Sequence, residues 1–221
     1  MAALTLPGVD VSMPSSVARD MSQWFTPAPL AERLVDWMGL PKKATVIEPS
    51  AGNGAIVRAL MRNPSRVSRV DAVELDSNHV RTLESIPHRD TASLTLAVEC
   101  ADYLTRPAPA ERYDFGVANP PYENDLDARF AAKLMDECDR VIILVRAVFF
   151  NGLGRYERVW SRVDADEWRI CGVAHLVRRP SFLLGGVEQG GAQADFVAIK
   201  MMRASNPGGP CAPVLKPEWW Q

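Results

Sequence analysis

The 221-residue chain is predicted to form an α/β domain built on a doubly wound, mostly parallel, seven-stranded sheet of Rossmann-like topology. Three observations predict this class. Apolar segments of strand length alternate with segments of helical periodicity, a glycine-rich turn joins the first predicted strand to a helix, and polar residues directly follow several strands. The length suits one well-packed domain, which we place at residues 21–203, between an N-terminal arm (1–20) and a Pro- and Gly-rich C-terminal tail (204–221).

The composition is 47% apolar and 24% charged, with a formal net charge of −2, which is typical of a soluble globular protein. No apolar segment reaches membrane-spanning length and the N-terminus lacks a signal-peptide pattern, so we expect a cytoplasmic protein with no membrane contact. Because the net charge is small, any nucleic-acid binding must use a local basic surface. The four cysteines form no Cys-x-x-Cys pair, so neither a disulfide framework nor a metal site is predicted.

The first predicted helix follows Thr26 and Pro27, a residue pair typical of a helix start. Leu30, Leu34 and Met38 recur every four residues and place one apolar stripe on a helix that extends to about residue 40. On local grounds, the aromatic, hydroxyl and proline residues before this helix could form only a hydrophobic staple and a cap.

Residues 44–47 predict the first strand, which leads through Glu48 and a glycine turn to a helix at 55–61. A strand, a glycine turn and a helix form a nucleotide-binding unit, because glycine lets the backbone approach a ligand closely. Val57 stands where the dinucleotide fingerprint has its third glycine, which favours a ligand without a pyrophosphate.

The second predicted strand, at 70–73, is followed by Glu74. This glutamate lies 20 residues after Gly54, where a carboxylate binds ribose hydroxyls in nucleoside-binding units. A carboxylate at a strand end is often only solvated or a helix cap, and we assign that role to Asp76. Residues 94–98 and 113–118 predict the third and fourth strands.

The second half of the chain continues the alternation of helices and strands. We predict helices at 127–139 and 155–169, strands at 140–145, 170–177 and 194–201, and a glycine-rich loop at 185–191. The helix at 155–169 carries four arginines, a pattern that usually marks only a solvated face.

Asn119-Pro120-Pro121-Tyr122 follows the fourth strand, and its two prolines end that strand and make the chain rigid. Ligands of open α/β sheets bind at this carboxyl edge. The Asn119 side chain and the Pro120 carbonyl offer hydrogen-bond acceptors beside the flat ring of Tyr122, an arrangement that suits a planar group carrying an NH2. The alternative is a rigid turn with a packing tyrosine.

Asn-Pro-Pro-Tyr in this position resembles the fourth motif of the S-adenosylmethionine-dependent amino-methyltransferases, which methylate N6 of adenine, N4 of cytosine or the amide of a protein glutamine. Gln23-x-x-Thr26-Pro27 ahead of the glycine turn resembles the tenth motif of the adenine-methylating subclass that places this motif first. The resemblance extends over about residues 23–201. It implies that the catalytic residues are Asn119, Pro120, Pro121 and Tyr122.

The resemblance also implies S-adenosylmethionine as the cofactor. The Thr-Pro loop would lie against its methionine end, Glu48 would contact its amino group, Glu74 its ribose, and Asp102 its adenine, with Tyr103 packing nearby. Asp102 could otherwise be a plain loop residue. The full set of predicted cofactor-binding residues is Phe25, Thr26, Pro27, Glu48, Pro49, Ser50, Ala51, Gly52, Glu74, Leu75, Asp102, Tyr103 and Asn119.

Arg179-Pro180-Ser181-Phe182, ahead of the glycine-rich loop, resembles the eighth motif of the family, in which an aromatic residue stacks on an extruded target base. Phe182 would then stack opposite Tyr122, and would otherwise be an ordinary apolar anchor. We predict that Arg155 and Arg179 contact the substrate as well.

The implied function is transfer of a methyl group to N6 of adenine in DNA, with base flipping. No long insertion follows the eighth motif, where relatives carry a target-recognition domain, so we expect a short or loose recognition site, as in a solitary, phage-borne modification enzyme. The same chemistry on adenine in structured RNA or on a protein glutamine is an alternative, and a catalytically idle cofactor-binding module is another. A nicotinamide oxidoreductase is disfavoured by the missing third glycine, and the oligomeric state is left open.

Overall fold

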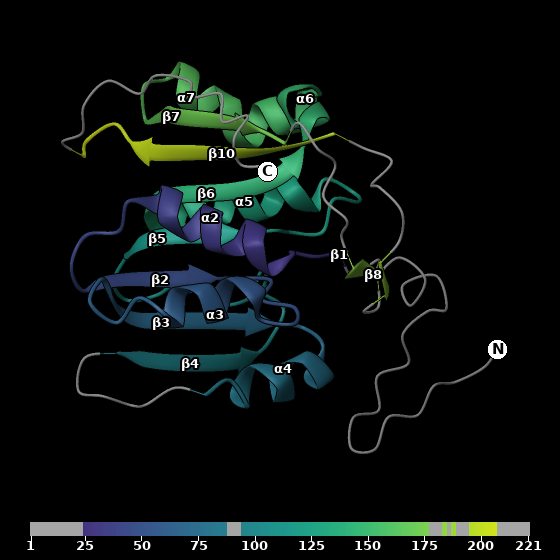
Figure 1. The fold of residues 1–221 in the computed structure, drawn as a ribbon. Helices are drawn as coiled ribbons and strands as arrows, with labels where there is room; N and C mark the ends of the chain where they lie inside the picture. The colour runs from purple at the N-terminus through teal and green to yellow at the C-terminus, as the bar shows by residue number, and fades with distance from the viewer. Residues whose placement is uncertain (1–23, 88–93, 177–182, 185–186, 189–194, 207–221) are drawn as a thin grey trace.

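The structure is a computed structural model that describes residues 24–87, 94–176, 183–184, 187–188 and 195–206. The predicted arm at 1–20 and most of the predicted tail at 204–221 lie outside these residues, so the domain boundaries stay a prediction. The described chain is organised around a single large sheet with helices on both faces (Figure 1).

Seven strands form the large sheet, in the spatial order β4-β3-β2-β5-β6-β10-β7. Neighbouring strands are parallel from β4 to β6, whereas β10 runs antiparallel to both β6 and β7. This arrangement confirms the predicted doubly wound, mostly parallel sheet. The strands are β2 (Ala44–Glu48), β3 (Val67–Glu74), β4 (Thr95–Cys100), β5 (Tyr113–Ala118), β6 (Cys138–Arg146), β7 (Trp168–His175) and β10 (Phe196–Arg203).

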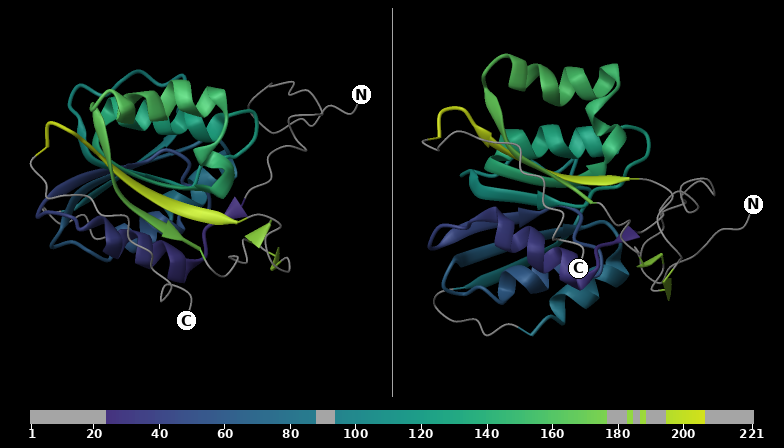
Figure 2. Two further views of the ribbon diagram at one scale, coloured as in Figure 1. Left: turned by 90° about the horizontal axis from the view of Figure 1, so that it is seen from above. Right: turned by 45° about the horizontal axis from the view of Figure 1, so that its top comes forward.

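Helices α2 (Ala28–Met38), α3 (Ala55–Met61) and α4 (Ser77–Glu84) pack on one face of the sheet. Helix α5 (Leu126–Glu137) and a helical segment at 147–164 pack on the opposite face, as the view from above shows (Figure 2). Two apolar cores result, one on each side of the sheet. None of the described helices is both long enough and apolar enough to span a bilayer.

Apolar periodicity explains why these segments take their places. Leu30, Leu34 and Met38 are all buried, which confirms the predicted stripe on α2, and Gly39 ends that helix in the left-handed conformation. In β6, the five consecutive residues 141–145 are all 0% exposed. A strand with helices on both faces has no solvent side, so its sequence is continuously apolar rather than alternating.

The helix predicted at 155–169 is wrong at both ends. The helical segment consists of η1 (Ala147–Phe150), α6 (Leu153–Arg155), the π-helical η2 (Tyr156–Trp160) and α7 (Ser161–Asp164). Asp166 has a positive φ of 54°, which ends the helix, and Trp168 and Arg169 already belong to β7. Pairing with β10 recruits them into the sheet, a tertiary contact that helical periodicity cannot reveal.

A second, small sheet was not predicted. It joins β1 (Trp24–Phe25), β8 (Leu183–Leu184) and β9 (Val187–Glu188) in antiparallel pairs, so one strand directly precedes the glycine-rich loop predicted at 185–191 and another lies within it. Strands of two residues are too short for periodicity to detect. Their pairing brings the chain around residue 25 next to the chain around residue 184.

We predict that Gly116→Ala destabilises the fold. A Cβ atom at this position in β5 would lie 2.6 Å from Leu134 Cδ2 and 2.8 Å from Cys138 Sγ, and both neighbouring side chains are fully buried. Overpacking of this kind costs about 1–3 kcal/mol, to be measured by urea denaturation. Ala97→Val, on the exposed edge strand β4, is the matched control and should change stability by less than about 0.5 kcal/mol. Equal midpoints for Gly116→Ala and the unmodified protein would contradict the prediction.

Candidate functional site

The carboxyl ends of β2, β3 and β5 lie side by side at one edge of the sheet, because these strands pair in parallel. The arrows of β2, β3 and β4 in Figure 1 end on the side of the molecule where β1 and β8 lie. The loops that leave these three strands carry most of the residues that we predicted to be functional. Topology therefore gathers segments that are far apart in the sequence.

The glycine turn after β2 is tied to the end of β3 by Glu74. One carboxylate oxygen of Glu74 accepts a hydrogen bond from the Gly52 N–H at 2.7 Å, and the other accepts from the Asp76 N–H at 2.9 Å. Asp76 in turn caps α4 by accepting from the Asn78 N–H at 2.8 Å, as predicted. These two hydrogen bonds to the carboxylate of Glu74 fix the shape of the loop. Glu74 is 8% exposed, and its role as a ribose ligand stays a prediction.

Glu48, the last residue of β2, is 2% exposed. Burial and the nearby charge of Glu74 raise the pKa of the Glu48 carboxyl well above its usual value, against the opposing effects of the Val57 N–H and Arg58. Its Oε2 atom has no hydrogen-bond partner in the described part of the chain. A buried carboxylate oxygen without a partner is costly, and a ligand ammonium group would supply both the missing hydrogen bond and the opposite charge.

Phe25, at the end of β1, and Thr26, before α2, also lie at this edge of the sheet. The ring of Phe25 lies directly over Gly52 and makes an edge contact with His79, with ring centroids 5.1 Å apart. Thr26 is buried, and its hydroxyl accepts a hydrogen bond from the Asn119 amide nitrogen at 3.0 Å. The predicted Thr-Pro loop, glycine turn and Asn-Pro-Pro-Tyr segment thus meet in one place.

Asn119 follows β5, and hydrogen bonds hold its side chain on both sides. Its amide nitrogen donates to Thr26, and its carbonyl oxygen accepts from the Tyr122 hydroxyl. The Asn119 backbone carbonyl also accepts from the Ser50 hydroxyl at 3.3 Å. A carbonyl oxygen has two lone pairs and can accept two hydrogen bonds.

The ring of Tyr122 is packed rather than open. It is 7% exposed, lies 5.4 Å from the ring of Phe196 in β10, and has the Arg146 guanidinium 5.7 Å from its centroid. Burial raises the pKa of the Tyr122 hydroxyl above its usual value. Stacking of this ring on a target base requires the side chain to move, and its role in substrate binding stays a prediction.

Comparison with known proteins adds information on the fold. No family model matches the chain. The tRNA1(Val) (adenine(37)-N6)-methyltransferase of Proteus mirabilis is 30% identical over 87 residues, which cover 39% of this chain and 34% of that protein. The chain therefore matches about a third of the length of this relative.

Two solved structures resemble the chain more extensively. The modification subunit of a proposed type I restriction enzyme from Vibrio vulnificus has a TM-score of 0.63 and 13% identity, and covers 86% of this chain and 46% of its own. A proposed RNA methyltransferase from Pyrococcus horikoshii has a TM-score of 0.62 and 16% identity, and covers 84% of this chain and 88% of its own. The chain has the methyltransferase fold.

Three further predicted cofactor residues follow strands β4 and β3 of this methyltransferase fold. Asp102 is exposed, and its Oδ1 accepts from the Leu104 N–H at 2.9 Å. The Tyr103 ring is 1% exposed, and its hydroxyl donates to Glu137 at 3.0 Å, so this ring belongs to the core under α5. Leu75 is 50% exposed beside Glu74, which leaves it as the apolar side chain available to a ligand.

The predicted substrate residues are only partly described. Phe182 and Arg179 lie outside the described residues. Arg155 is bound by carboxylates: its guanidinium contacts Asp127 at 3.1 Å and Asp125 at 3.7 Å. Its positive charge is therefore balanced within the protein, and a contact with a substrate phosphate stays a prediction.

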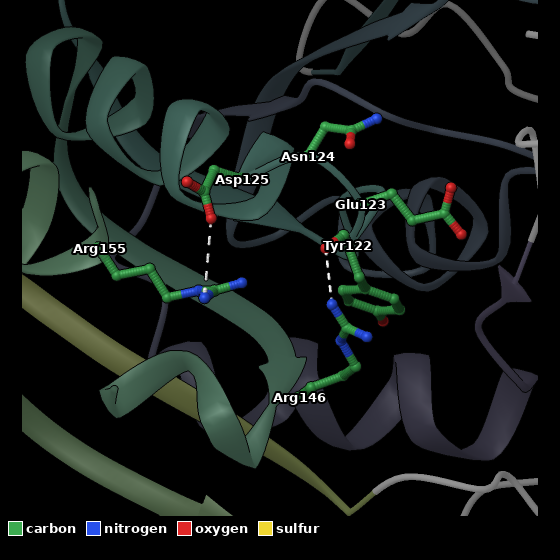
Figure 3. Close-up of a pocket in the computed structure, with 6 residues that line it drawn as sticks. All are labelled: Tyr122, Glu123, Asn124, Asp125, Arg146 and Arg155. Carbon is green, nitrogen blue, oxygen red and sulfur yellow. Dashed lines mark hydrogen bonds and ion pairs between the residues drawn. The ribbon is translucent and has the colours of Figure 1, made fainter. Parts of the chain in front are cut away.

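A pocket of about 550 Å³ opens beside Tyr122 (Figure 3). Its walls are formed by the loop that follows the two prolines and by two arginines; the lining residues are Tyr122, Glu123, Asn124, Asp125, Arg146 and Arg155. Our sequence interpretation missed Arg146. The available signal was a cation at the carboxyl end of an otherwise apolar parallel strand, the edge at which ligands bind.

We predict that Gly52→Ala weakens binding of S-adenosylmethionine. Gly52 has a φ of +52°, and a Cβ atom would lie 3.1 and 3.2 Å from two ring atoms of Phe25. Either the turn or the ring must shift, so we expect the Kd from calorimetry to rise about tenfold. Gly39→Ala is the matched control, because its φ of +65° is equally strained but the nearest atom lies 3.9 Å away. It should lower stability and leave the Kd unchanged; the prediction fails if both variants bind the cofactor equally well.

Proposed function

We propose that this protein transfers the methyl group of S-adenosylmethionine to N6 of adenine in DNA. One observation carries the proposal: the Asn119 carboxamide, at the carboxyl end of a central parallel strand, is held between Thr26 and Tyr122 beside the glycine turn. This arrangement supports the proposal, because a carboxamide oxygen next to a nucleoside-binding loop can accept a hydrogen bond from an amino group. When bound, the cofactor supplies an electrophilic methyl group on a sulfonium.

The residues at the three strand ends fit this cofactor. Glu48 would accept from its ammonium group, which would satisfy the unpartnered Oε2 atom. Glu74 would accept from its ribose hydroxyls, Asp102 from its adenine amino group, and Leu75 would cover the adenine ring. The segments 25–27 and 49–52 would enclose its methionine end.

At the target, the Asn119 side-chain oxygen and the Pro120 carbonyl would each accept one N–H of the adenine amino group. Two accepted hydrogen bonds withdraw the nitrogen lone pair from the ring and direct it toward the methyl group. The same two acceptors would stabilise the positive charge that grows on nitrogen, as an oxyanion hole stabilises negative charge, until the methylated nitrogen loses one proton to water. Extrusion of the base from a duplex costs a few kcal/mol, and stacking on Tyr122 and Phe182 would contribute about 1–3 kcal/mol for each base contact.

The test is incubation of the purified protein with labelled S-adenosylmethionine and, separately, double-stranded DNA, single-stranded DNA, tRNA and ribosomal RNA. Mass spectrometry of the digested nucleosides then identifies the methylated base. We expect N6-methyladenine in DNA. Methyl transfer to RNA or to protein, with none to DNA, would contradict the proposal.

A second candidate is methylation of adenine N6 in tRNA. It is favoured by one observation, the 30% identity over 87 residues to the Proteus mirabilis protein, whose name gives tRNA as its substrate. The same panel of substrates separates the two candidates, because the residues invoked at the target nitrogen serve either one.

A further inference from the structure

Arg146, at the end of β6, carries a positive charge that no described carboxylate balances. Its Nη2 atom donates to the Tyr122 backbone carbonyl at 2.8 Å, and its guanidinium covers the Tyr122 ring. Its Nε atom is buried and has no hydrogen-bond partner within the described chain. Among the described residues, no acidic oxygen lies within 4.0 Å of it. A partly buried cation in this state is costly unless an anion approaches it.

Arg155, on the opposite side of the same pocket, provides the contrast. Its side chain is 14% exposed and is bound to the buried Asp127 and to Asp125. These ion pairs hold the loop after the two prolines, in which Asn124 and Asp125 have positive φ values of 51° and 56°. Arg155 therefore shapes one wall of the pocket, whereas Arg146 lines it without a described carboxylate partner.

The arrangement of the pocket suits an anion. Figure 3 shows the guanidinium groups of Arg146 and Arg155 directed toward the same space, with the Glu123 carboxylate directed away from Arg146. Arg155 is bound to the buried Asp127 and, at 3.7 Å, to Asp125, whereas Arg146 is the lining cation that no described carboxylate approaches within 4.0 Å. The volume of about 550 Å³ is large enough for a phosphate with its sugar.

We propose that this pocket binds a phosphate of the nucleic-acid strand next to the target nucleotide, and that the Arg146 guanidinium donates hydrogen bonds to that phosphate. The proposal rests on the proposed function and adds a contact to it. Guanidinium groups bind phosphate oxygens with two parallel hydrogen bonds, and such contacts fix the register of a strand without reading its sequence. Since Arg146 also holds Tyr122, one side chain would link the position of the strand to the residue predicted to receive the base.

The experiment is a salt titration of binding, measured by fluorescence anisotropy with a labelled duplex that contains adenine. Arg146→Gln should raise the Kd about tenfold, and should reduce the slope of log K against log salt by about 0.9, the value for one lost phosphate contact. The Kd for S-adenosylmethionine should not change. Arg158→Gln, an exposed arginine outside the pocket, is the matched control and should leave the slope unchanged.

A lysine at this position separates charge from packing. Arg146→Lys retains the charge, so it should retain the slope of the unmodified protein even if the Arg146→Gln variant proves unstable. The proposal is overturned if Arg146→Gln keeps the original Kd and slope and only slows methyl transfer, because Arg146 would then act solely by positioning Tyr122. If the unmodified protein binds no nucleic acid, the proposed function fails together with this inference, and that outcome is visible before any variant is made.

Discussion

Asn119→Ala should lower the rate of methyl transfer about 10²- to 10³-fold, the loss typical of removing one group that stabilises a developing charge. The substitution removes the acceptor for the target amino group. It also removes the link between Thr26 and Tyr122. Cofactor affinity should change far less, because Glu48 and Glu74 keep their positions. Single-turnover transfer of labelled methyl, together with calorimetry for the cofactor, separates the two effects.

Two further variants serve as controls for Asn119→Ala. Asn119→Asp keeps an acceptor oxygen and should retain more activity than the alanine variant. Asn63→Ala removes an asparagine whose amide donates to the Ala59 carbonyl, at 3.0 Å, and should leave methyl transfer unchanged. If Asn119→Ala were as active as the unmodified protein, the role that we assign to this carboxamide would be wrong.

Glu48→Gln should make the protein more stable and at the same time weaken cofactor binding. Burial raises the pKa of Glu48 in the folded state, so the folded state favours the protonated form. The associated stability is fully present below the unfolded pKa of about 4.3 and is lost as the pH rises through the folded pKa. Glutamine cannot ionise and therefore avoids this loss. The melting temperature of Glu48→Gln should exceed that of the unmodified protein at pH 8, with a smaller difference at pH 5.

The same substitution removes the carboxylate that we expect to contact the cofactor ammonium. A hydrogen bond to a charged group contributes about 1.5–3 kcal/mol, so the Kd should rise about 10- to 100-fold. In the unmodified protein, the Kd should fall as the pH rises, because the ammonium favours ionised Glu48. Glu84→Gln, at an exposed position of α4, is the control and should change neither property. A Glu48→Gln protein that melts earlier at every pH and binds the cofactor normally would show that Glu48 has a structural role.

Much of the candidate site was predictable because its signals are local. Glu48 and Glu74 each follow an apolar strand, and the prolines at 120 and 121 must end the strand before them. Parallel strands align such ends at one edge, so the convergence of these residues follows from the fold class. The limits of the strands were less accurate, since β3 begins at Val67 rather than at residue 70.

Other features depended on contacts that no local pattern encodes. The burial of the Tyr122 ring results from contact with Phe196, and the core position of Tyr103 results from its contacts with Phe130 and Glu137. We predicted that Arg155 contacts the substrate, yet its guanidinium is bound by Asp125 and Asp127 at the start of α5. Sequence patterns show that a residue is charged or aromatic, but not which partner satisfies it.

The sequence by itself determined the positions along the chain of the seven strands of the large sheet, the glycine turn and the polar residues at the strand ends, because periodicity and turn chemistry act between near neighbours. Only the tertiary structure decided which of these polar groups are satisfied by the protein and which remain open to a ligand. Thr26 and Asn119 are 93 positions apart and share a hydrogen bond, whereas Glu48 and Arg146 each keep a buried polar atom without a partner in the described chain. Hydrogen bonds and counter-charges form between segments brought together by folding, so their presence or absence is a property of the folded molecule.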